Sequence, residues 1–453
     1  MREAFASYVT VSIDIDDAKS FCFEFKVQSV PWMLVIDPER REKLAEWTEF
    51  VDAPTLAKAL RDLAAARAAA PPPAGGAKTG AVRAFYKRTG LSFETGDGRL
   101  VLDFWTHVMA QDIASLGTDF PGDTSRIRHA RFGIQGTLDG RFTALAHVDF
   151  AFAQPLLDFW GEYQVSKPLN LRVGRFKVPM GTQFLPRRDF WDHVEPPGYL
   201  FALLPRRDVG AMVYGGGGYA DVYLKYWVGV WNGVPDGYGD VDDSKELAAR
   251  ATLSPFPSPG FNLDLSATWT GGNSDEGMGT FRVTDESITD ILRFPAAVVH
   301  DGLRRRWSVE GELRWECVAV GAEAIRQQSH LMAGGVTDRY ELEAASAWAA
   351  WIVTGERKSR DEWFDPTYKV GAFELVARWS AFRADGRLAT IATPGRYTRR
   401  ASQVAGGINW YPSRFARVMV GVQRSLYEDR IQREPGTTSG HRLALLLAAE
   451  LHF

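Results

Sequence analysis

Cysteine is scarce in this chain, which has only Cys22 and Cys317 among its 453 residues. The two lie far apart in sequence, which argues against a disulfide framework and against a cysteine-based metal site. The eight histidines show no paired spacing such as H-x-x-x-H, the usual pattern of a helical metal site. We therefore expect neither a metal nor another cofactor.

Long apolar runs are missing as well. No stretch of 18 or more consecutive apolar residues occurs, so the sequence predicts no transmembrane helix. The formal net charge of -3 argues against a basic protein that coats nucleic acid. The first residues, MREAFASYVTV, lack the charged region and apolar core of a secretion signal.

Three regions of different composition follow one another along the chain. Residues 1–68 show a mixed α/β pattern, in which WMLVIDPE and KLAEWTEFV read as strands and APTLAKALRDLAAARAAA reads as an amphipathic helix. Residues 69–80 include PPPAGGAKTG and form a Pro/Gly/Ala linker. From residue 81 to 453 the apolar residues alternate with polar ones, as in β-strands.

The alternating segments are long. RWSVEGELRWEC sets Trp307, Val309 and Leu313 against a charged face, and FTALAHVDFAF and YADVYLKYWVGVW behave alike. Many segments reach ten residues, against about 5–6 for strands of soluble proteins, and aromatic residues lie at their ends. The glycine run Gly215–Gly218 reads as a hairpin turn between two of them. We count roughly sixteen segments, an even number typical of an antiparallel outer-membrane β-barrel with an apolar face toward lipid.

The C-terminus fits this mainly β interpretation. LALLLAAELHF alternates apolar residues and stops on Phe453. A terminal aromatic residue after such a strand resembles the recognition signal that outer-membrane proteins present to their assembly machinery.

Several strings resemble one barrel family in order and spacing. They are RIRHARFGIQGTLDGRFTALAHVDFAF, LRVGRFKVPMGTQF, LLPRRDVGAMVYG and VGVWNG, and the resemblance to the phosphate-selective porin O/P family covers about residues 85–453. It implies a homotrimeric outer-membrane porin that catalyses no reaction and admits small anions, phosphate or polyphosphate, through an Arg/Lys-lined constriction. One departure is Arg206, which stands where the family commonly has glycine before its Arg-Asp pair.

The candidate pore residues cluster around LRVGRFKVPMGTQFLPRRDF. Its alternation places Arg175 and Lys177 on one face, toward a water-filled lumen, and Phe176 and Val178 toward lipid. The resemblance implies that the segment after Pro179 folds into the lumen and narrows it. By the same alternation His129 and Arg131 point inward. The expected pore-lining and anion-binding residues are Arg131, Arg175, Lys177, Arg187, Arg188, Arg206 and Arg207.

Arginine suits phosphate because its planar guanidinium donates two parallel hydrogen bonds and keeps its charge. The alternative is that these cations pair with nearby acids, of which Asp189, Asp192, Glu195 and Asp208 are candidates. Residues 1–80 hold 12 of the 56 acids and 10 of the 53 bases, which leaves 44 and 43 for the barrel. Total charge therefore does not favour anions, and the acidic face of Glu310, Glu312 and Glu316 argues partly against them.

Two other functions stay open on the sequence alone. The barrel could be non-selective, or plugged and structural. A secreted β-rich carbohydrate-active enzyme with paired carboxylates would also alternate, but it needs shorter strands and a buried apolar core.

The N-terminal region resembles a second fold. FEFKVQSVPWMLVIDPE is similar to the second half of a thioredoxin fold, in which the residue matching Pro31 follows a cis peptide bond beside the redox site. The half with Cys-x-x-Cys is absent, so Cys22 reads as a buried helix cysteine. We expect the natural protein to begin further upstream, with a secretion signal and a fuller thioredoxin-like domain in the periplasm.

Overall fold

The computed structural model describes residues 33–37, 42–47, 82–87, 90–116, 123–166, 168–187, 191–219, 221–240, 242–258, 260–358, 363–434 and 437–453. The chain divides into two compact units, residues 1–79 and 80–453. In the first unit, β1 (Met33–Asp37) and β2 (Glu42–Trp47) pair in antiparallel fashion. They match two of the strands expected there, WMLVIDPE and KLAEWTEFV; a third, expected in SYVTVSIDID, lies outside the described residues. Pro31, Cys22 and the expected helices lie outside the described residues, so the thioredoxin-like interpretation stays a prediction.

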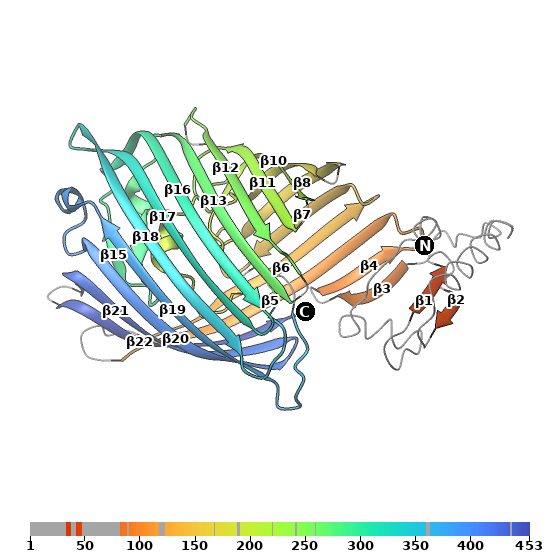
Figure 1. The fold of residues 1–453 in the computed structure, drawn as a ribbon. Coiled ribbons are helices and arrows are strands. Elements are labelled where there is room, and N and C mark those ends of the chain that lie inside the picture. The colour runs from red at the N-terminus through yellow and green to blue at the C-terminus, as the bar shows by residue number, and fades with distance from the viewer. Residues whose placement is uncertain are drawn as a thin grey trace. The chain divides into compact units, whose positions relative to one another are not determined.

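The second unit is a closed antiparallel barrel with sixteen wall strands (Figure 1). Closure occurs where β22 pairs with β5, from Ala444–Ser115 to His452–His107. Two shorter strands, β3 (Val82–Lys87) and β4 (Gly90–Thr95), form a hairpin that pairs with the start of β5. The wall strands are β5 (Leu100–Ser115), β6 (Thr124–Leu138), β7 (Phe142–Asp149), β8 (Leu156–Ser166), β9 (Leu169–Lys177), β10 (Arg207–Tyr219), β11 (Val222–Trp231), β12 (Glu246–Pro255), β13 (Phe261–Ser274), β16 (Val299–Trp315), β17 (Val318–Ala333), β18 (Val336–Ile352), β19 (Ala372–Ala384), β20 (Arg400–Ser413), β21 (Ala416–Glu434) and β22 (Thr437–His452).

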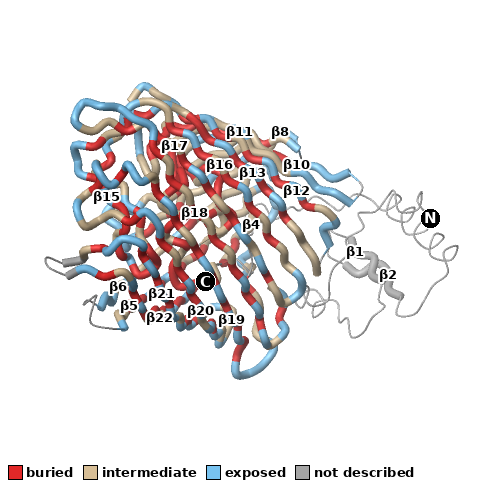
Figure 2. Tube along the Cα trace, turned by 60° about the vertical axis from the view of Figure 1, so that its left-hand side comes forward, coloured by how far each residue is buried: buried red, intermediate tan, exposed pale blue. Residues whose placement is uncertain are grey.

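The expected alternation is confirmed along these strands, where buried and more exposed residues follow each other (Figure 2). Outward side chains are largely apolar, such as Val309 at 63% exposure and Val404 at 61%. Trp315, Trp351 and Trp410 are exposed, and they lie on β16, β18 and β20 near the strand ends on the side where β22 ends. An exposed apolar band with an aromatic border is the surface that a barrel presents to lipid. No described helix is long and apolar enough to cross a membrane.

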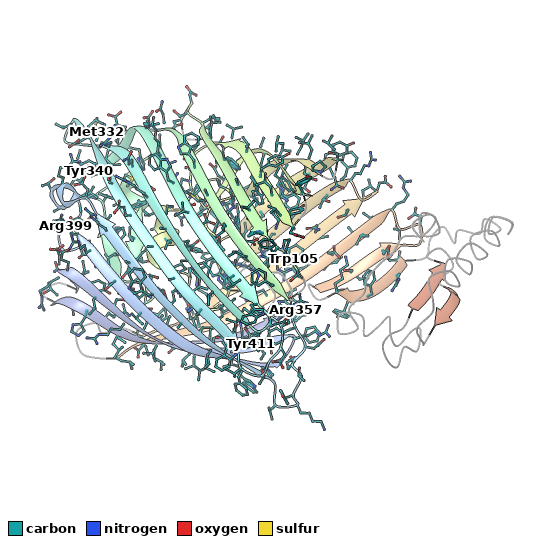
Figure 3. All side chains as sticks on the ribbon, in the orientation of Figure 1. Trp105, Met332, Tyr340, Arg357, Arg399 and Tyr411 are labelled. Atoms are coloured by element: carbon teal, nitrogen blue, oxygen red, sulfur yellow. The ribbon has the colours of Figure 1, made fainter. Side chains whose placement is uncertain are left out.

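The two ends of the barrel differ in their connections. At the end that carries the C-terminus, neighbouring strands are joined by short turns, except for the longer segment 353–371. In Figure 3, Arg357 and Tyr411 lie toward this end, and Met332, Tyr340 and Arg399 toward the opposite one. The long connections 178–206, 232–245, 275–298 and 385–399 leave the strands at the opposite end. Short periplasmic turns and long extracellular loops are typical of outer-membrane barrels.

Two of these loops fold into the barrel. Segment 178–206, the constriction loop, contains the helix α4 (Gly198–Leu203), and segment 275–298 contains η2 (Met278–Thr280), β14 (Arg282–Thr284) and β15 (Asp290–Arg293). α4 packs on β17, β18 and β19. The two loops and these strands share one apolar cluster, which includes Tyr199, Leu200, Leu203, Ile291, Leu292, Phe294, Ile325, Leu342 and Phe382. Because each such buried side chain contributes roughly 1.5–3 kcal/mol, this cluster holds both loops firmly inside the lumen.

The prediction of a turn at Gly215–Gly218 is wrong. These glycines lie within β10, and they pair with β11 as far as Gly218–Tyr223. Glycine occurs at this position because the backbone just before β9 comes close to it: a Cβ on Gly215 would lie 1.7 Å from the carbonyl oxygen of Pro168. Glycine is needed there for space rather than for a turn.

The prediction that Phe176 and Val178 face lipid is also wrong, since they are only 1% and 2% exposed. Both pack with Met212 and Trp231. The strict period of two fails near Gly174, whose φ of +128° is a conformation that side chains other than glycine rarely adopt. Alternation therefore predicted β9 itself but not the orientation of its last residues.

Candidate functional site

A cavity of about 440 Å³ lies against the inner face of β5 to β13 and beside the constriction loop. It lies apart from the apolar cluster, whose wall residues come from β17 to β21. Among the residues that the structure describes, seven cationic side chains line the cavity, but only two acidic ones, Asp158 and Asp264. The cations are Arg131, Arg172, Lys177, Arg187, Arg207, Lys225 and Arg250.

Arg131 is held on β6 by a carboxylate of the next strand. Its Nε donates to Asp149 Oδ2 at 2.8 Å, and His129 Nδ1 lies 2.7 Å from the same oxygen. A β-bulge at Arg128 interrupts the β5–β6 register between Met109 and Ala110. These contacts agree with the expected inward orientation of His129 and Arg131. They also show Arg131 paired with an acid, which is the alternative that the sequence left open.

Arg207, at the start of β10, forms a bidentate ion pair. Its Nε and a terminal nitrogen donate to the two oxygens of Asp158 at 3.0 and 3.1 Å. His147 Nδ1 lies 2.9 Å from Asp158 as well. All three side chains are buried. Fork-to-fork geometry of this kind fixes the plane of the guanidinium at the cavity wall.

Arg172 and Arg250 are cavity residues that sequence reasoning missed. Arg172 donates to Glu162 Oε2 at 2.8 and 2.6 Å, and its guanidinium lies 3.9 Å from the centre of the Trp160 ring. Arg250 lies 2.7 Å from Glu310. The alternation of β9 did contain a signal for Arg172, because it lies between the outward residues Leu171 and Val173.

Two more lining cations lie at and in the constriction loop, Lys177 at the end of β9 just before the loop and Arg187 within it. Lys177 Nζ donates to the carbonyl oxygens of Phe184, Leu185 and Pro186 at 2.8, 3.0 and 2.6 Å, so it fixes the first turn of the loop. The guanidinium of Arg187 lies 4.9 Å from the Trp105 ring centre and 5.4 Å from that of Trp363. Such stacking holds an arginine in place while leaving its charge uncompensated by the ring.

Two of the predicted residues, Arg175 and Arg206, are not in the cavity lining. Arg175 is buried and donates to the backbone carbonyls of Leu156, Asp236 and Gly237 at 2.9, 3.0 and 2.8 Å. Arg206 pairs with Asp236 at 2.9 Å in an exposed position. Arg188 lies outside the described residues. The structure thus brings together Arg131, Lys177, Arg187 and Arg207 of the seven.

Lys225 is a further lining cation that sequence reasoning missed. It lies on β11 opposite Thr252 and near Ser266, which lies on β13. In the part of the chain that the structure describes, no acid lies within ion-pairing distance of its ammonium group. The strand pattern contained a signal, since Lys225 is a cation on the polar face of YADVYLKYWVGVW.

A second polar cluster anchors the constriction loop to the wall near the C-terminal end. Lys358, in segment 353–371, donates to Asp192 of the constriction loop and to Glu374 of β19. Burial alone would lower the pKa of Lys358, but the two carboxylates raise it above its ordinary value. Asn409 adds hydrogen bonds to the Asp192 carbonyl at 2.7 Å and to Glu374 at 2.8 Å. Asp192 is thus paired, but with Lys358, which is distant in sequence and is not one of the candidate pore cations.

Glu286, in the second infolded loop, is a titratable group inside the barrel. Burial raises its pKa to about 7, although Arg378 Nε donates to it at 2.9 Å; the charges of Asp285 and Glu195 raise it further. The folded state therefore retains a proton that the unfolded state releases near pH 4.5, so stability falls as pH rises from about 4.5 to 7. Glu286→Gln is expected to remove most of this loss, which is on the order of 3 kcal/mol.

The measurement is denaturant unfolding at pH 5 and pH 8, followed by the mobility shift between folded and unfolded barrel. Glu428→Gln, at an exposed glutamate, is the control. If the stability of Glu286→Gln depends on pH in the same way as that of the parent chain, the ionisation of buried Glu286 is not the cause of that dependence.

Among solved structures, several outer-membrane proteins are similar to this chain. The anion-selective porin from Comamonas acidovorans has 9% identity and a TM-score of 0.50, covering 78% of this chain and 100% of that one. The outer membrane channel DcaP of Acinetobacter baumannii has 11% identity and a TM-score of 0.49, covering 81% and 100%. The trimer form of in-vitro folded OmpT of Vibrio cholerae has 10% identity and a TM-score of 0.48, covering 78% and 100%. At 9% identity, the likeness to the Comamonas acidovorans porin concerns the fold alone.

No curated protein matches the chain significantly by sequence. By contrast, residues 106–448 match the family described as phosphate-selective porin O and P. That range covers most of the barrel, including every cationic residue of the cavity lining. The sixteen-stranded closed barrel and its infolded constriction loop agree with a porin. The chain therefore belongs to the phosphate-selective porin O and P family, the outer-membrane β-barrel porins of bacteria, and is not an enzyme.

Proposed function

We propose that this porin conducts small anions, phosphate or polyphosphate among them, along the cationic cavity beside the constriction loop. The observation that carries the proposal is the excess of seven cationic over two acidic side chains in the cavity lining. Charged lumen groups replace part of the hydration shell of a passing ion, and several weak sites in series allow release. Local clustering, rather than total charge, would then set the preference.

The pore-lining roles of Arg131, Lys177, Arg187 and Arg207 belong to this proposal, together with Arg172, Lys225 and Arg250. Arg131, Arg172, Arg207 and Arg250 already bind carboxylates, so their positive charge is partly compensated. We propose that they shape the field of the pore and that Lys225, which shares its part of the lining with Asp264, approaches the ion more directly. Arg188 stays a candidate, whereas the buried contacts of Arg175 and the exposed pair of Arg206 argue against a role in the cavity for either.

Lys225→Glu tests this assignment. The change puts a negative charge into the lining without breaking an ion pair among the described residues, so we expect the anion-to-cation permeability ratio to fall at least about fivefold. The measurement is the zero-current potential of single channels in a salt gradient. Lys369→Glu, at an exposed position of segment 353–371, makes the same charge change outside the cavity and should leave the ratio near that of the parent chain.

A plugged structural barrel is the second candidate, and the apolar cluster inside the lumen favours it. The two infolded loops close the lumen beside β17 to β21 with buried apolar side chains. In that case purified barrels in planar bilayers would show no conductance steps. The anion-channel proposal requires conductance steps from the unmodified chain, because on the β5–β13 side of the lumen the charged cavity would carry the ions.

Assembly and placement of the first unit complete the proposal. We propose a homotrimer on the basis of the family, which native mass spectrometry of detergent-extracted protein would test. The chain enters the barrel through β3 at the short-turn end, and short turns are typical of the periplasmic side. This supports a periplasmic location for the first unit, to be tested by protease access from the periplasm.

A further inference from the structure

The cavity lining is aromatic as well as cationic. Trp105, Trp160, Trp227 and Phe176 contribute to it, and Leu145 and Met212 add aliphatic surface. A bare phosphate ion gains nothing from a ring face, because its recognition rests on charge and hydrogen bonds. Sites for organic molecules, by contrast, are lined mostly by apolar and aromatic side chains with a few placed polar groups.

The volume leads in the same direction. At about 440 Å³, the cavity falls within the range of about 300–1,000 Å³ that small-molecule sites occupy. Inorganic phosphate would fill a small part of it and would remain separated from most of the lining by water.

Several of the charged groups in the lining are already paired with acids, so they do not form a closed shell around a permeant anion. Arg131, Arg207 and Arg250 are each bound to a carboxylate at 2.8, 3.0 and 2.7 Å. A permeant anion must compete with those carboxylates for the guanidinium donors. Guanidinium groups also lie over the rings of Trp160, Trp105 and Trp227, at 3.9, 4.9 and 5.9 Å from the ring centres, so a flat apolar group would use the ring surface that they leave uncovered. The second source of affinity is thus the aromatic surface.

Lys225 and Trp227 lie two residues apart on β11, so both project from the same face of the strand. Thr252 and Ser266, whose hydroxyl oxygens lie 2.7 Å apart, face the same cavity beside Lys225. The ammonium group and the two hydroxyls lie next to an indole, and they share this part of the lining with the carboxylate of Asp264. An anionic group attached to a ring would take the place of Asp264 as the charge partner of Lys225, with its ring against the indole.

We propose that the preferred solute of the cavity is an organic anion with an aromatic portion, such as an aryl phosphate or aryl carboxylate, rather than bare phosphate. Its anionic group contacts Lys225, Thr252 and Ser266, and its ring lies against Trp227. This inference deepens the proposed function and rests on it, because it names the class of anion that the same cavity takes.

The test measures block of the single-channel chloride current by phenyl phosphate and by inorganic phosphate, in the full chain in planar bilayers. We expect half-block by phenyl phosphate at an at least about tenfold lower concentration, the ratio that one added aromatic contact supplies. Trp227→Ala should bring the two concentrations together by weakening phenyl phosphate alone. Trp227→Phe, which keeps a ring, should retain part of the difference.

Trp315→Ala is the matched control, because Trp315 is 63% exposed on the outer face of the barrel. It should behave like the parent chain. Equal block by the two solutes in the parent chain would overturn the inference and leave the anion channel intact. A parent channel that prefers cations would overturn the proposed function itself. Because the parent comparison needs no variant, the inference is testable even if Trp227→Ala does not fold.

Discussion

Arg207→Met is expected to lower the free energy of unfolding of the barrel by about 3–5 kcal/mol, the usual cost of removing one partner of a buried ion pair. Arg207 is buried, and it is the bidentate partner of Asp158. Methionine keeps much of the side-chain length, so the loss comes mainly from the carboxylate that stays buried beside His147. Denaturant titration of the folded barrel measures this change.

The same substitution removes one positive charge from the cavity lining and exposes the negative charge of Asp158 to the pore. We therefore expect the anion preference of the channel to fall together with stability. Arg206→Met is the neighbouring control, because Arg206 pairs with Asp236 while both side chains are exposed, at 41% and 45%. Exposed pairs contribute about 0–1 kcal/mol. Equal losses in the two variants would contradict the role assigned to the Arg207–Asp158 pair.

Lys358→Met is expected to release the constriction loop from the wall. Lys358 bridges Asp192 of that loop and Glu374 of β19, and without it two buried carboxylates would lie together without their cation. Mutual repulsion should drive Asp192 toward water, or force one carboxylate to take up a proton. We expect a larger and noisier single-channel conductance, with a stability loss of about 3–5 kcal/mol.

Lys245→Met provides the comparison, since Lys245 pairs with Asp240 at an exposed position. It should leave conductance and stability close to those of the parent chain. A Lys358→Met channel with unchanged conductance and noise would show that the other contacts of the loop, such as those of α4 and the hydrogen bond from Asn409, hold it in place without Lys358.

The sequence predicted the barrel well because its determinant is local. Alternation of apolar and polar residues in segments such as RWSVEGELRWEC decides which side of the wall a residue faces, and closure needs only an even set of such strands. β11 and β16 appear where that pattern placed them. The turn at Gly215–Gly218 was wrongly predicted because the glycine is needed for a contact with Pro168, just before β9. Such a contact between distant segments is not visible in the local pattern.

The site was predicted less completely, since its arrangement depends on contacts across the barrel. Arg207 and Lys177 were found because they flank the constriction loop. Arg175 was misplaced because segment 232–245 supplies the carbonyls that bind it. Lys358 meets Asp192 across 166 residues of chain, a pairing that no short-range pattern encodes.

The division of the lumen into two parts connects the fold with the proposed transport. On one side, the infolded loops and β17 to β21 form an apolar cluster that supports the constriction loop. On the other, β5 to β13 leave a cavity with charge and ring faces. A rigid loop beside a cationic wall is a suitable arrangement for selecting solutes, because the cavity keeps its shape as ions pass.

The zero-current potential of the parent channel across a potassium chloride gradient tests the central claim most directly. With seven cations and two acids lining the cavity, we predict a potential whose sign shows chloride to be more permeant than potassium. A potential of the opposite sign would contradict an anion-conducting pathway along this cavity.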